Sequence, residues 1–386
     1  MTQKEIFNEM KIGLVCPYDF FRHGAVQKLV ELLDEELSRR GHDVRIITPR
    51  PRNYVGDPPA RTIFVGRSTK WNTPLNTTLE VGMSFETESL EKMLAEENFD
   101  VIHVHEPEVP IIGSQIASRA NCPIIATFHA THPENTVGKT IELFRIPYAR
   151  SIFKNIAAMT AVSESAAKFV RDWSGQKITI VPNYIDIHTY RQGPKVKRNE
   201  NSILYIGRLE KRKGVKYLLY AFAALAARDK KVRLIIAGDG SERNKLEEWV
   251  EENNVPRVRF LGNVTEAKKV SLLKTAGMFC SPAIYGESFG VVLLEAMAAG
   301  APTVAGDNQG YACVMKGRGT LSLVNPKDTD DFSRRLELFL RDDEIRNTWL
   351  DWAKEYVEQF DSMPVIDQYE KFYFDIVNKS RIIEPA

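Results

Sequence analysis

Two glutamates, Glu287 and Glu295, stand eight positions apart in the chain and could act on one ligand. Glu287 lies between Gly286 and Gly290 in an expected loop, and Glu295 lies two turns into an apolar run that stops at Gly300. Both carboxylates can accept hydrogen bonds from ligand hydroxyl groups. The alternative interpretation is a surface loop before an ordinary core helix, since glutamate is common in helices.

The start of this expected helix offers a second kind of chemistry. The first backbone N–H groups of a helix have no partners within the helix, so they can stabilise a phosphate or sugar hydroxyl groups. The residues that we expect to contribute here are Ser288, Phe289, Gly290 and Val291.

An apolar run at residues 203–206 leads into a glycine-bounded turn that carries Arg208 and Lys213. The pattern predicts a buried parallel strand, a turn with two fixed cations, and then a helix. Such a turn is suited to an anionic ligand.

The two stretches together resemble the nucleotide-sugar site of the large family of retaining glycosyltransferases that includes the phosphatidylinositol mannosyltransferases. The E-x7-E pattern of the family lies on Glu287 and Glu295, and its G-R-x4-K-G pattern lies on residues 207–214. Both motifs in this order, about eighty residues apart, are highly specific. The resemblance extends over residues 10–377.

The resemblance implies roles for these residues. When the nucleoside diphosphate leaves, Arg208 and Lys213 are expected to stabilise the charge on its β-phosphate. Glu287 is expected to accept hydrogen bonds from the hexose, and Glu295 from the ribose. The resemblance further implies retention of the anomeric configuration, no enzyme nucleophile, and no metal or other cofactor, because the two cations replace a metal.

Further donor contacts follow from the same resemblance. Gly207 belongs to the first motif, and residues 260–264 resemble the family segment that borders the base, which adds Val264. Lys269 follows nearby, although an exposed loop and helix start is an alternative for it. The isolated Gly-x-Gly at residues 238–240 lacks the third glycine of a dinucleotide fingerprint, which argues against a nicotinamide dehydrogenase.

The chain opens with an apolar strand at residues 11–16, then a loop, a helix and another strand, and this order predicts a parallel sheet. Gly24 would let the backbone approach a diphosphate at the helix start, whereas Ala25 replaces the second glycine of the family. Tyr18 and Gln27 are expected on the acceptor side. An ordinary turn before a helix is the alternative.

Histidines mark two further strands. His103 alternates with apolar residues inside a strand and is expected in the core. His105 lies at the carboxyl end of that strand, where open α/β sheets bind ligands, so we expect it on the acceptor side. His129 follows the next strand, and in this family a histidine there lies beside the transferred hexose. Without the resemblance, His129 is a polar residue at a strand end.

A chain of 386 residues is too long for one ordinary core. The resemblance implies an α/β architecture of the GT-B type, with two doubly wound Rossmann-like domains facing a central cleft. We expect an acceptor-side domain at residues 1–190 and a donor-binding domain at residues 198–362. The basic stretch 191–201 reads as a linker, and a last helix at about 363–386 is expected to pack back on the first domain.

Composition narrows the possible partners and the location. The net charge of +1 gives no global attraction to nucleic acid or anionic lipid, so we expect no nucleic-acid partner. The four cysteines are far apart and lack metal-ligand spacing. No apolar run reaches the length of a bilayer-spanning helix, and the first ten residues are polar. We therefore expect a cytoplasmic protein, with peripheral contact to the inner face of the membrane left open.

The similarity to the phosphatidylinositol mannosyltransferases is carried by residues 15–18, 105–107 and 286–290. It favours GDP-mannose as the donor. A transferase that uses a UDP-sugar on the same fold is an alternative, and a non-catalytic protein that binds nucleotide sugars is a second one.

Two differences from those enzymes concern the acceptor. Where those enzymes carry a basic cluster, this chain has Glu86, Glu88, Glu91 and Lys92. Residues 72–81 also lack the arginine that would hold an inositol phosphate. We therefore expect a lipid or glycan acceptor without specifying it further.

Overall fold

The structure is a computed structural model, and it describes residues 8–22, 24–72, 78–83, 87–109, 112–131, 152–194 and 196–383. The chain forms two compact units. Unit 1 comprises Met1–Asn183 and Ser362–Ala386, and unit 2 comprises Tyr184–Asp361.

Unit 1 is built on an eight-stranded sheet in the order β4-β3-β2-β1-β5-β6-β7-β8. All neighbouring strands are parallel except the hairpin of β3 and β4. The strands are β1 (Lys11–Val15), β2 (Asp43–Arg50), β3 (Thr62–Asn72), β4 (Thr78–Met83), β5 (Val101–His105), β6 (Ile124–Phe128), β7 (Ala158–Ala161) and β8 (Ile178–Ile180).

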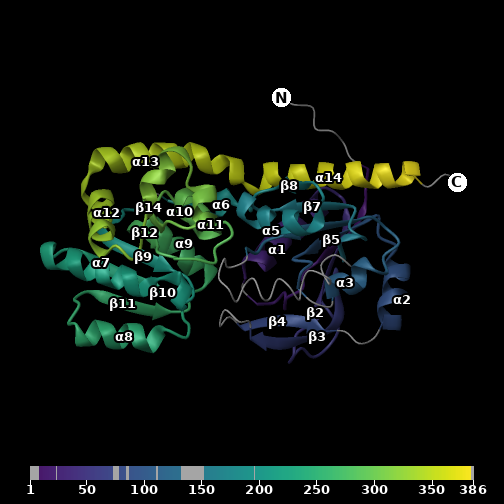
Figure 1. Ribbon diagram of the computed structural model, residues 1–386, viewed down its shortest axis with the longest axis horizontal. Coiled ribbons are helices and arrows are strands. Elements are labelled where there is room, and N and C mark those ends of the chain that lie inside the picture. The colour runs from purple at the N-terminus through teal and green to yellow at the C-terminus, as the bar shows by residue number, and fades with distance from the viewer. Residues whose placement is uncertain are drawn as a thin grey trace. The chain divides into compact units, whose positions relative to one another are not determined.

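Helices cover this sheet, and the long yellow helix of Figure 1, α14, packs against α1. The C-terminal helix therefore belongs to unit 1. The helices of unit 1 are α1 (Ala25–Arg39), α2 (Thr87–Glu97), α3 (Ile112–Ala117), α5 (Glu164–Ser174) and α14 (Ser362–Ile383). Of the helix predicted at residues 139–156, residues 139–151 lie outside the described part of the chain.

Unit 2 contains a six-stranded, fully parallel sheet in the order β11-β10-β9-β12-β13-β14. In chain order this is 3-2-1-4-5-6, the doubly wound order of dinucleotide-binding folds. The strands are β9 (Asn199–Ile206), β10 (Arg233–Ala237), β11 (Val258–Gly262), β12 (Ala276–Ser281), β13 (Thr303–Gly306) and β14 (Leu323–Val324).

The helices of unit 2 connect these strands, and α7 and α12 pack against each other. They are α6 (Ile187–Arg191), η1 (Lys211–Lys213), α7 (Val215–Arg228), α8 (Arg243–Glu252), α9 (Glu266–Thr275), α10 (Val291–Ala298), α11 (Gln309–Val314), η2 (Gly317–Ser322), α12 (Thr329–Arg341), α13 (Asp343–Tyr356) and η3 (Val357–Phe360), where η marks 3-10 helices.

The strand order places the site motifs. Within each sheet the order reverses between two central strands, β1 and β5 in unit 1 and β9 and β12 in unit 2. Ligands of open α/β sheets bind outside the carboxyl ends of such strands. Most of the expected site residues of unit 2 follow β9 and β12 and so lie at this edge, whereas Val264 and Lys269 follow β11.

The structure differs from the expected domain limits. The chain passes between the units after Asn183 and after Asp361, and the basic stretch 191–201 lies inside unit 2. The reason is α6, which packs on α10, while the Ile187 N–H donates to the Asp361 carboxylate. In unit 1, α1 begins at Ala25 with Gly24 as its N-cap, so both residues lie at the helix start. In the described part of the chain, no helix is both long and apolar enough to cross a membrane.

Candidate active site

A tight turn after β9 positions the two expected cations. Gly207 adopts φ +157° and Gly214 adopts φ +69° at the two ends of the turn. A Cβ on Gly214 would lie 2.1 Å from the Pro282 carbonyl oxygen, so a side chain there would collide with the segment after β12. The Ile284 N–H donates to the Arg212 carbonyl oxygen (2.9 Å), which joins the turn to the loop that carries Glu287.

The charged groups of the turn and the loop form one connected set, which we call the ion-pair array. Arg208 contacts Glu210 at 2.8 Å, and Arg212 contacts the other Glu210 oxygen at 2.9 Å. Glu287 Oε1 lies 2.9 Å from Arg212 Nη1 and 2.7 Å from Lys213 Nζ. Three cations therefore face two carboxylates, which leaves a local formal charge of +1 for an anionic ligand.

Exposure differs within the ion-pair array. The Arg208 side chain is 52% exposed, whereas the side chains of Arg212, Lys213 and Glu287 are largely covered. Burial lowers the pKa of Lys213; Glu287 opposes this shift, and the neighbouring guanidinium groups of Arg212 and Arg208 reinforce it. Glu287 thus helps to keep the Lys213 ammonium charged.

A second cluster surrounds the other carboxylate of the E-x7-E pattern. Glu295 is 9% exposed, and its Oε1 accepts hydrogen bonds from Lys269 Nζ (2.7 Å) and the Tyr190 hydroxyl (2.8 Å). Lys269 also contacts Glu266 at 2.8 Å. Burial alone would lower the pKa of Lys269, but these two carboxylates outweigh burial and raise it. The structure therefore brings together two residues that were predicted separately as donor contacts, Lys269 and Glu295.

The start of α10 has the geometry expected of it. Gly290 is the N-cap with φ +111°, and a Cβ there would lie 2.7 Å from the buried Tyr311 ring. Phe289 is buried against Phe360 with ring centroids 5.7 Å apart, so Phe289 can offer its backbone rather than its ring. The remaining predicted donor contacts are half-buried, with Ser288 and Val291 beside this N-cap and Val264 in the loop before α9.

Unit 1 groups its predicted residues around the loop after β1. The Gln27 side-chain amide donates to the Asp19 carbonyl oxygen at 3.2 Å, and a Cβ on Gly24 would lie 2.1 Å from Gln27 Oε1. Tyr18 donates its hydroxyl to Glu106, a residue with φ +49° at the end of β5. The loop after β1 and the end of β5 thus meet at the strand-order reversal of unit 1.

Three buried histidines of unit 1, His103, His105 and His129, lie against one another. His105 Nδ1 lies 2.9 Å from His129 Nε2, and the His103 and His105 ring centroids are 4.1 Å apart. Burial lowers the pKa of His129 to about 4, with partial opposition from Asn183, and lowers the pKa of His103 to about 3. These imidazoles are neutral near pH 7, so His129 is suited to hydrogen bonding rather than to a cationic role.

His103 is the core histidine that the sequence predicts. Its two ring nitrogens lie 2.6 Å from the hydroxyls of Tyr373 on α14 and Thr127 on β6. His105 is 2% exposed, and its contact with His129 places it behind the candidate catalytic histidine; an acceptor contact by His105 stays a prediction.

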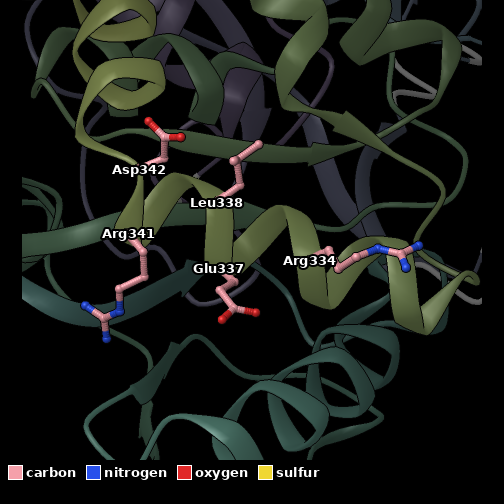
Figure 2. A pocket seen from close by; sticks show the side chains of 5 residues that line it. All are labelled: Arg334, Glu337, Leu338, Arg341 and Asp342. Atoms are coloured by element: carbon pink, nitrogen blue, oxygen red, sulfur yellow. The ribbon is translucent and has the colours of Figure 1, made fainter.

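A depression on α12 lies apart from these motifs (Figure 2). Of its charged lining residues, Glu337 contacts Arg228 at 3.0 Å and Arg341 contacts Asp229. The residues that line it are Arg334, Glu337, Leu338, Arg341 and Asp342. Because none of the motif residues lies on α12, this depression is not part of the candidate site.

Comparison with known proteins follows the same division of the chain. Residues 26–189 match the family described as Glycosyltransferase Family 4, and residues 186–356 match the family described as Glycosyl transferases group 1. A phosphatidyl-myo-inositol mannosyltransferase from Mycolicibacterium smegmatis is 33% identical over 94% of this chain and 93% of that protein. The chain belongs to glycosyltransferase family 4.

A second relative and two solved structures are also similar to the chain. A phosphatidyl-myo-inositol mannosyltransferase from Mycobacterium leprae is 30% identical over 98% of this chain and all of that protein. Among solved structures, the sucrose-phosphate synthase of Thermosynechococcus elongatus has a TM-score of 0.76 at 21% identity and covers 96% of this chain and 100% of that one. Anabaena HepE, solved with UDP-glucose, has a TM-score of 0.73 at 17% identity and covers 94% of this chain and 99% of that one. These structures establish the glycosyltransferase fold of two Rossmann-like units.

Two residues of this family 4 glycosyltransferase, Arg212 and Tyr190, were missed in the sequence. Arg212 joins Glu210 to Glu287 and also donates to the Gly286 carbonyl oxygen at 2.9 Å. Tyr190 holds Glu295 from within the stretch that was predicted to lie in the other domain. The only available signal for Arg212 was its place inside the G-R-x4-K-G spacing, which does not reveal which intervening side chain turns inward.

Proposed function

We propose that the protein is a retaining mannosyltransferase that transfers mannose from GDP-mannose to a membrane lipid or a glycan. The observation that carries this proposal is the ion-pair array, in which Arg208 and Lys213 stand at the strand-order reversal of unit 2. A nucleoside diphosphate adds negative charge to this region, which has a formal excess of one cation.

The proposed reaction is the front-face transfer that the family resemblance implies. The acceptor hydroxyl attacks the anomeric carbon, the bond from this carbon to the β-phosphate oxygen breaks, and the hydroxyl proton passes to the departing phosphate on the same face. Arg208 and Lys213 stabilise the charge on the leaving group, each contributing on the order of 2–4 kcal/mol to the transition state. Glu287, held by two cations, serves as a hydrogen-bond acceptor for the hexose rather than as a nucleophile.

The relatives support the choice of substrates. Their names specify a mannosyl group and a phosphatidyl-myo-inositol acceptor, and they align with almost the entire chain. We extend the mannosyl group and a membrane-lipid acceptor to this protein as part of the proposal. Transfer is expected without a divalent metal, because Arg208 and Lys213 supply the charge at the diphosphate.

A labelled-donor assay tests the proposal. The full chain is incubated with labelled GDP-mannose, UDP-glucose or UDP-N-acetylglucosamine, together with membrane lipid extract or soluble sugars, with and without excess chelator. We expect label from GDP-mannose to enter an extractable product with or without chelator, and NMR of the new linkage to show the donor's anomeric configuration. Transfer from a UDP-sugar instead, or strict dependence on added metal, would overturn the donor or the metal-free mechanism.

A further inference from the structure

Four aromatic rings of unit 1 form a surface cluster beside the loop after β1. Phe21 stacks on Tyr54 with ring centroids 5.7 Å apart and meets Phe64 at 6.1 Å. Tyr54 and Phe64 are 5.0 Å apart, and Phe20 lies 6.0 Å from Phe21. These rings and the adjacent Val55 are called the aromatic patch below.

The aromatic patch presents apolar groups to solvent. Val55 is 95% exposed and Phe21 is 46% exposed. Among the described residues, six large apolar side chains are exposed, and two of them lie in this one patch. Isolated exposed apolar residues are common, whereas a cluster of them points to an interaction surface.

Cations surround the aromatic patch. The Arg50 guanidinium lies over the Phe64 ring, 5.4 Å from its centroid, and Arg52 is exposed. The Arg22 side chain is 62% exposed and contacts Asp19 at 3.7 Å. In residues 50–69, Arg61 is paired with Asp34, which leaves three arginines (50, 52 and 67) against one aspartate (57), a formal charge of +2 in a chain whose total is +1. Positive charge therefore exceeds negative charge in this segment.

The aromatic patch also adjoins the predicted acceptor side. Phe20 and Phe21 follow Tyr18 closely in the same loop, and Thr48 near the end of β2 donates its hydroxyl to the Tyr18 carbonyl oxygen at 2.8 Å. A partner that binds the aromatic patch would therefore lie beside the acceptor-side loop.

We propose that the aromatic patch docks on an anionic lipid bilayer, with Phe21 and Val55 in the headgroup region and the arginines against lipid phosphates. Aromatic side chains favour the membrane–water interface, and basic residues near an anionic leaflet add attraction. This inference rests on the proposed function, because a lipid acceptor gives the protein a reason to bind a bilayer. The positions of the aromatic and basic residues do not depend on the identity of the acceptor.

The same reasoning excludes α2 as the docking element. Its exposed surface carries Glu88, Glu91 and Glu96 against Lys92, so an anionic bilayer would repel it. A polyanion such as heparin could also bind the arginines, but it would not require exposed Phe21 and Val55.

Vesicle cosedimentation of the full chain tests this inference without any transfer assay. The probes are vesicles of phosphatidylcholine alone and vesicles that also contain phosphatidylglycerol. We expect the wild type to bind the anionic vesicles, the double variant Phe21→Ser/Val55→Ser to bind them about tenfold or more weakly, and Arg50→Gln/Arg52→Gln to bind about tenfold or more weakly.

Matched controls lie in unit 2. Val196→Ser removes an exposed valine, and Arg318→Gln/Arg334→Gln removes two exposed arginines, so both should bind vesicles as the wild type does. GDP binding, measured on every variant, reports folding and the proposed donor site. Equal vesicle binding by all variants would overturn the bilayer assignment. The assignment would also fail if heparin binding depends on the arginines while Phe21→Ser/Val55→Ser changes neither heparin binding nor vesicle binding. The donor-site proposal would stand in both cases if GDP binding is retained.

Discussion

Glu287 contacts two cations of the ion-pair array, and this geometry fixes what its removal should do. Glu287→Gln removes the carboxylate that opposes the lowered pKa of Lys213 while leaving a polar side chain of the same size. We expect strongly reduced transfer, with GDP binding retained at neutral pH.

The pH dependence of GDP binding distinguishes this effect of Glu287 on the Lys213 charge from a purely structural role. Without Glu287, the Lys213 pKa falls further, so GDP binding must take up a proton and weakens as the pH rises into the alkaline range. Calorimetric titrations with GDP at several pH values measure this slope. A parallel pH dependence in the wild type and in Glu287→Gln would show that Glu287 does not hold the Lys213 charge.

The buried histidines predict a different pH dependence, that of stability. His103 and His129 titrate at about 3 and about 4 in the folded chain, well below the usual unfolded value of about 6.5. The unfolded chain therefore binds more protons between these values, and stability falls as the pH drops from about 6.5 toward about 4.

The variant His103→Gln removes one of these groups. The slope of the free energy of unfolding against pH should decrease by about 1.4 kcal/mol per pH unit in this window. Denaturant titrations of both proteins at matched pH values provide the slopes. If the slopes coincide, His103 is not buried in its neutral form.

The site residues that could be predicted from the sequence all lie in sequence motifs. Arg208, Lys213 and Glu287 lie in motifs with fixed spacing, and the structure joins them in one array. Arg212 and Tyr190 contribute through tertiary contacts that spacing does not encode. The same limit applies to His105, since a position at a strand end does not reveal that the ring is buried behind His129.

At the scale of elements, Arg198 joins the carboxyl ends of the two helices that carry Lys269 and Glu295. Its guanidinium donates to the carbonyl oxygens of Leu273 and Ala276 at the end of α9 and of Ala299 at the end of α10. A cation in this position also complements both helix dipoles.

Arg198→Met should therefore destabilise the protein by about 2–3 kcal/mol, because three carbonyl groups lose a charged donor. It should also weaken GDP binding by loosening the Lys269–Glu295 pair. Lys197→Met is the matched control, since Lys197 is exposed and adjacent. Denaturant unfolding that is the same for both variants would contradict this role of Arg198.

Elements with clear apolar runs were predicted well. The strand expected at residues 11–16 coincides with β1, and the buried strand expected at residues 203–206 forms the end of β9. The expected linker differed because its basic composition suggests solvent exposure, whereas Arg198 is held by helix ends and β9 already begins at Asn199. Composition reports the average environment of a segment, and it does not report individual tertiary contacts.

In the whole molecule, the parallel sheet of unit 1 followed from the alternation of strands and helices, and the presence of two doubly wound domains followed from the family resemblance. The order of the strands comes from the structure. The predicted contributors to transfer are divided between the units, with Arg208 and Glu287 in unit 2 and Gly24, Gln27 and His129 in unit 1. We therefore expect transfer to need residues of both units.

A donor that contacts both units should favour the conformation in which they meet around it, by its differential affinity for that conformation. Small-angle scattering should then give a smaller radius of gyration with saturating GDP-mannose than without it. Gly24→Leu, which places a bulky side chain against Gln27, should reduce the change. An unchanged radius, together with unaltered donor affinity in Gly24→Leu, would contradict a donor site shared between the units.

The central claim is that Arg208 and Lys213 of the ion-pair array bind a nucleoside diphosphate. Calorimetric titration of GDP into the wild type, Arg208→Gln, Lys213→Gln and Lys211→Gln tests it most directly, because Lys211 is an exposed cation in the same turn and serves as the matched control. We expect equal GDP affinity for the wild type and Lys211→Gln, and affinity about tenfold or more weaker for each of the other two variants. Equal GDP affinity in all four folded proteins would contradict a nucleoside diphosphate site on Arg208 and Lys213.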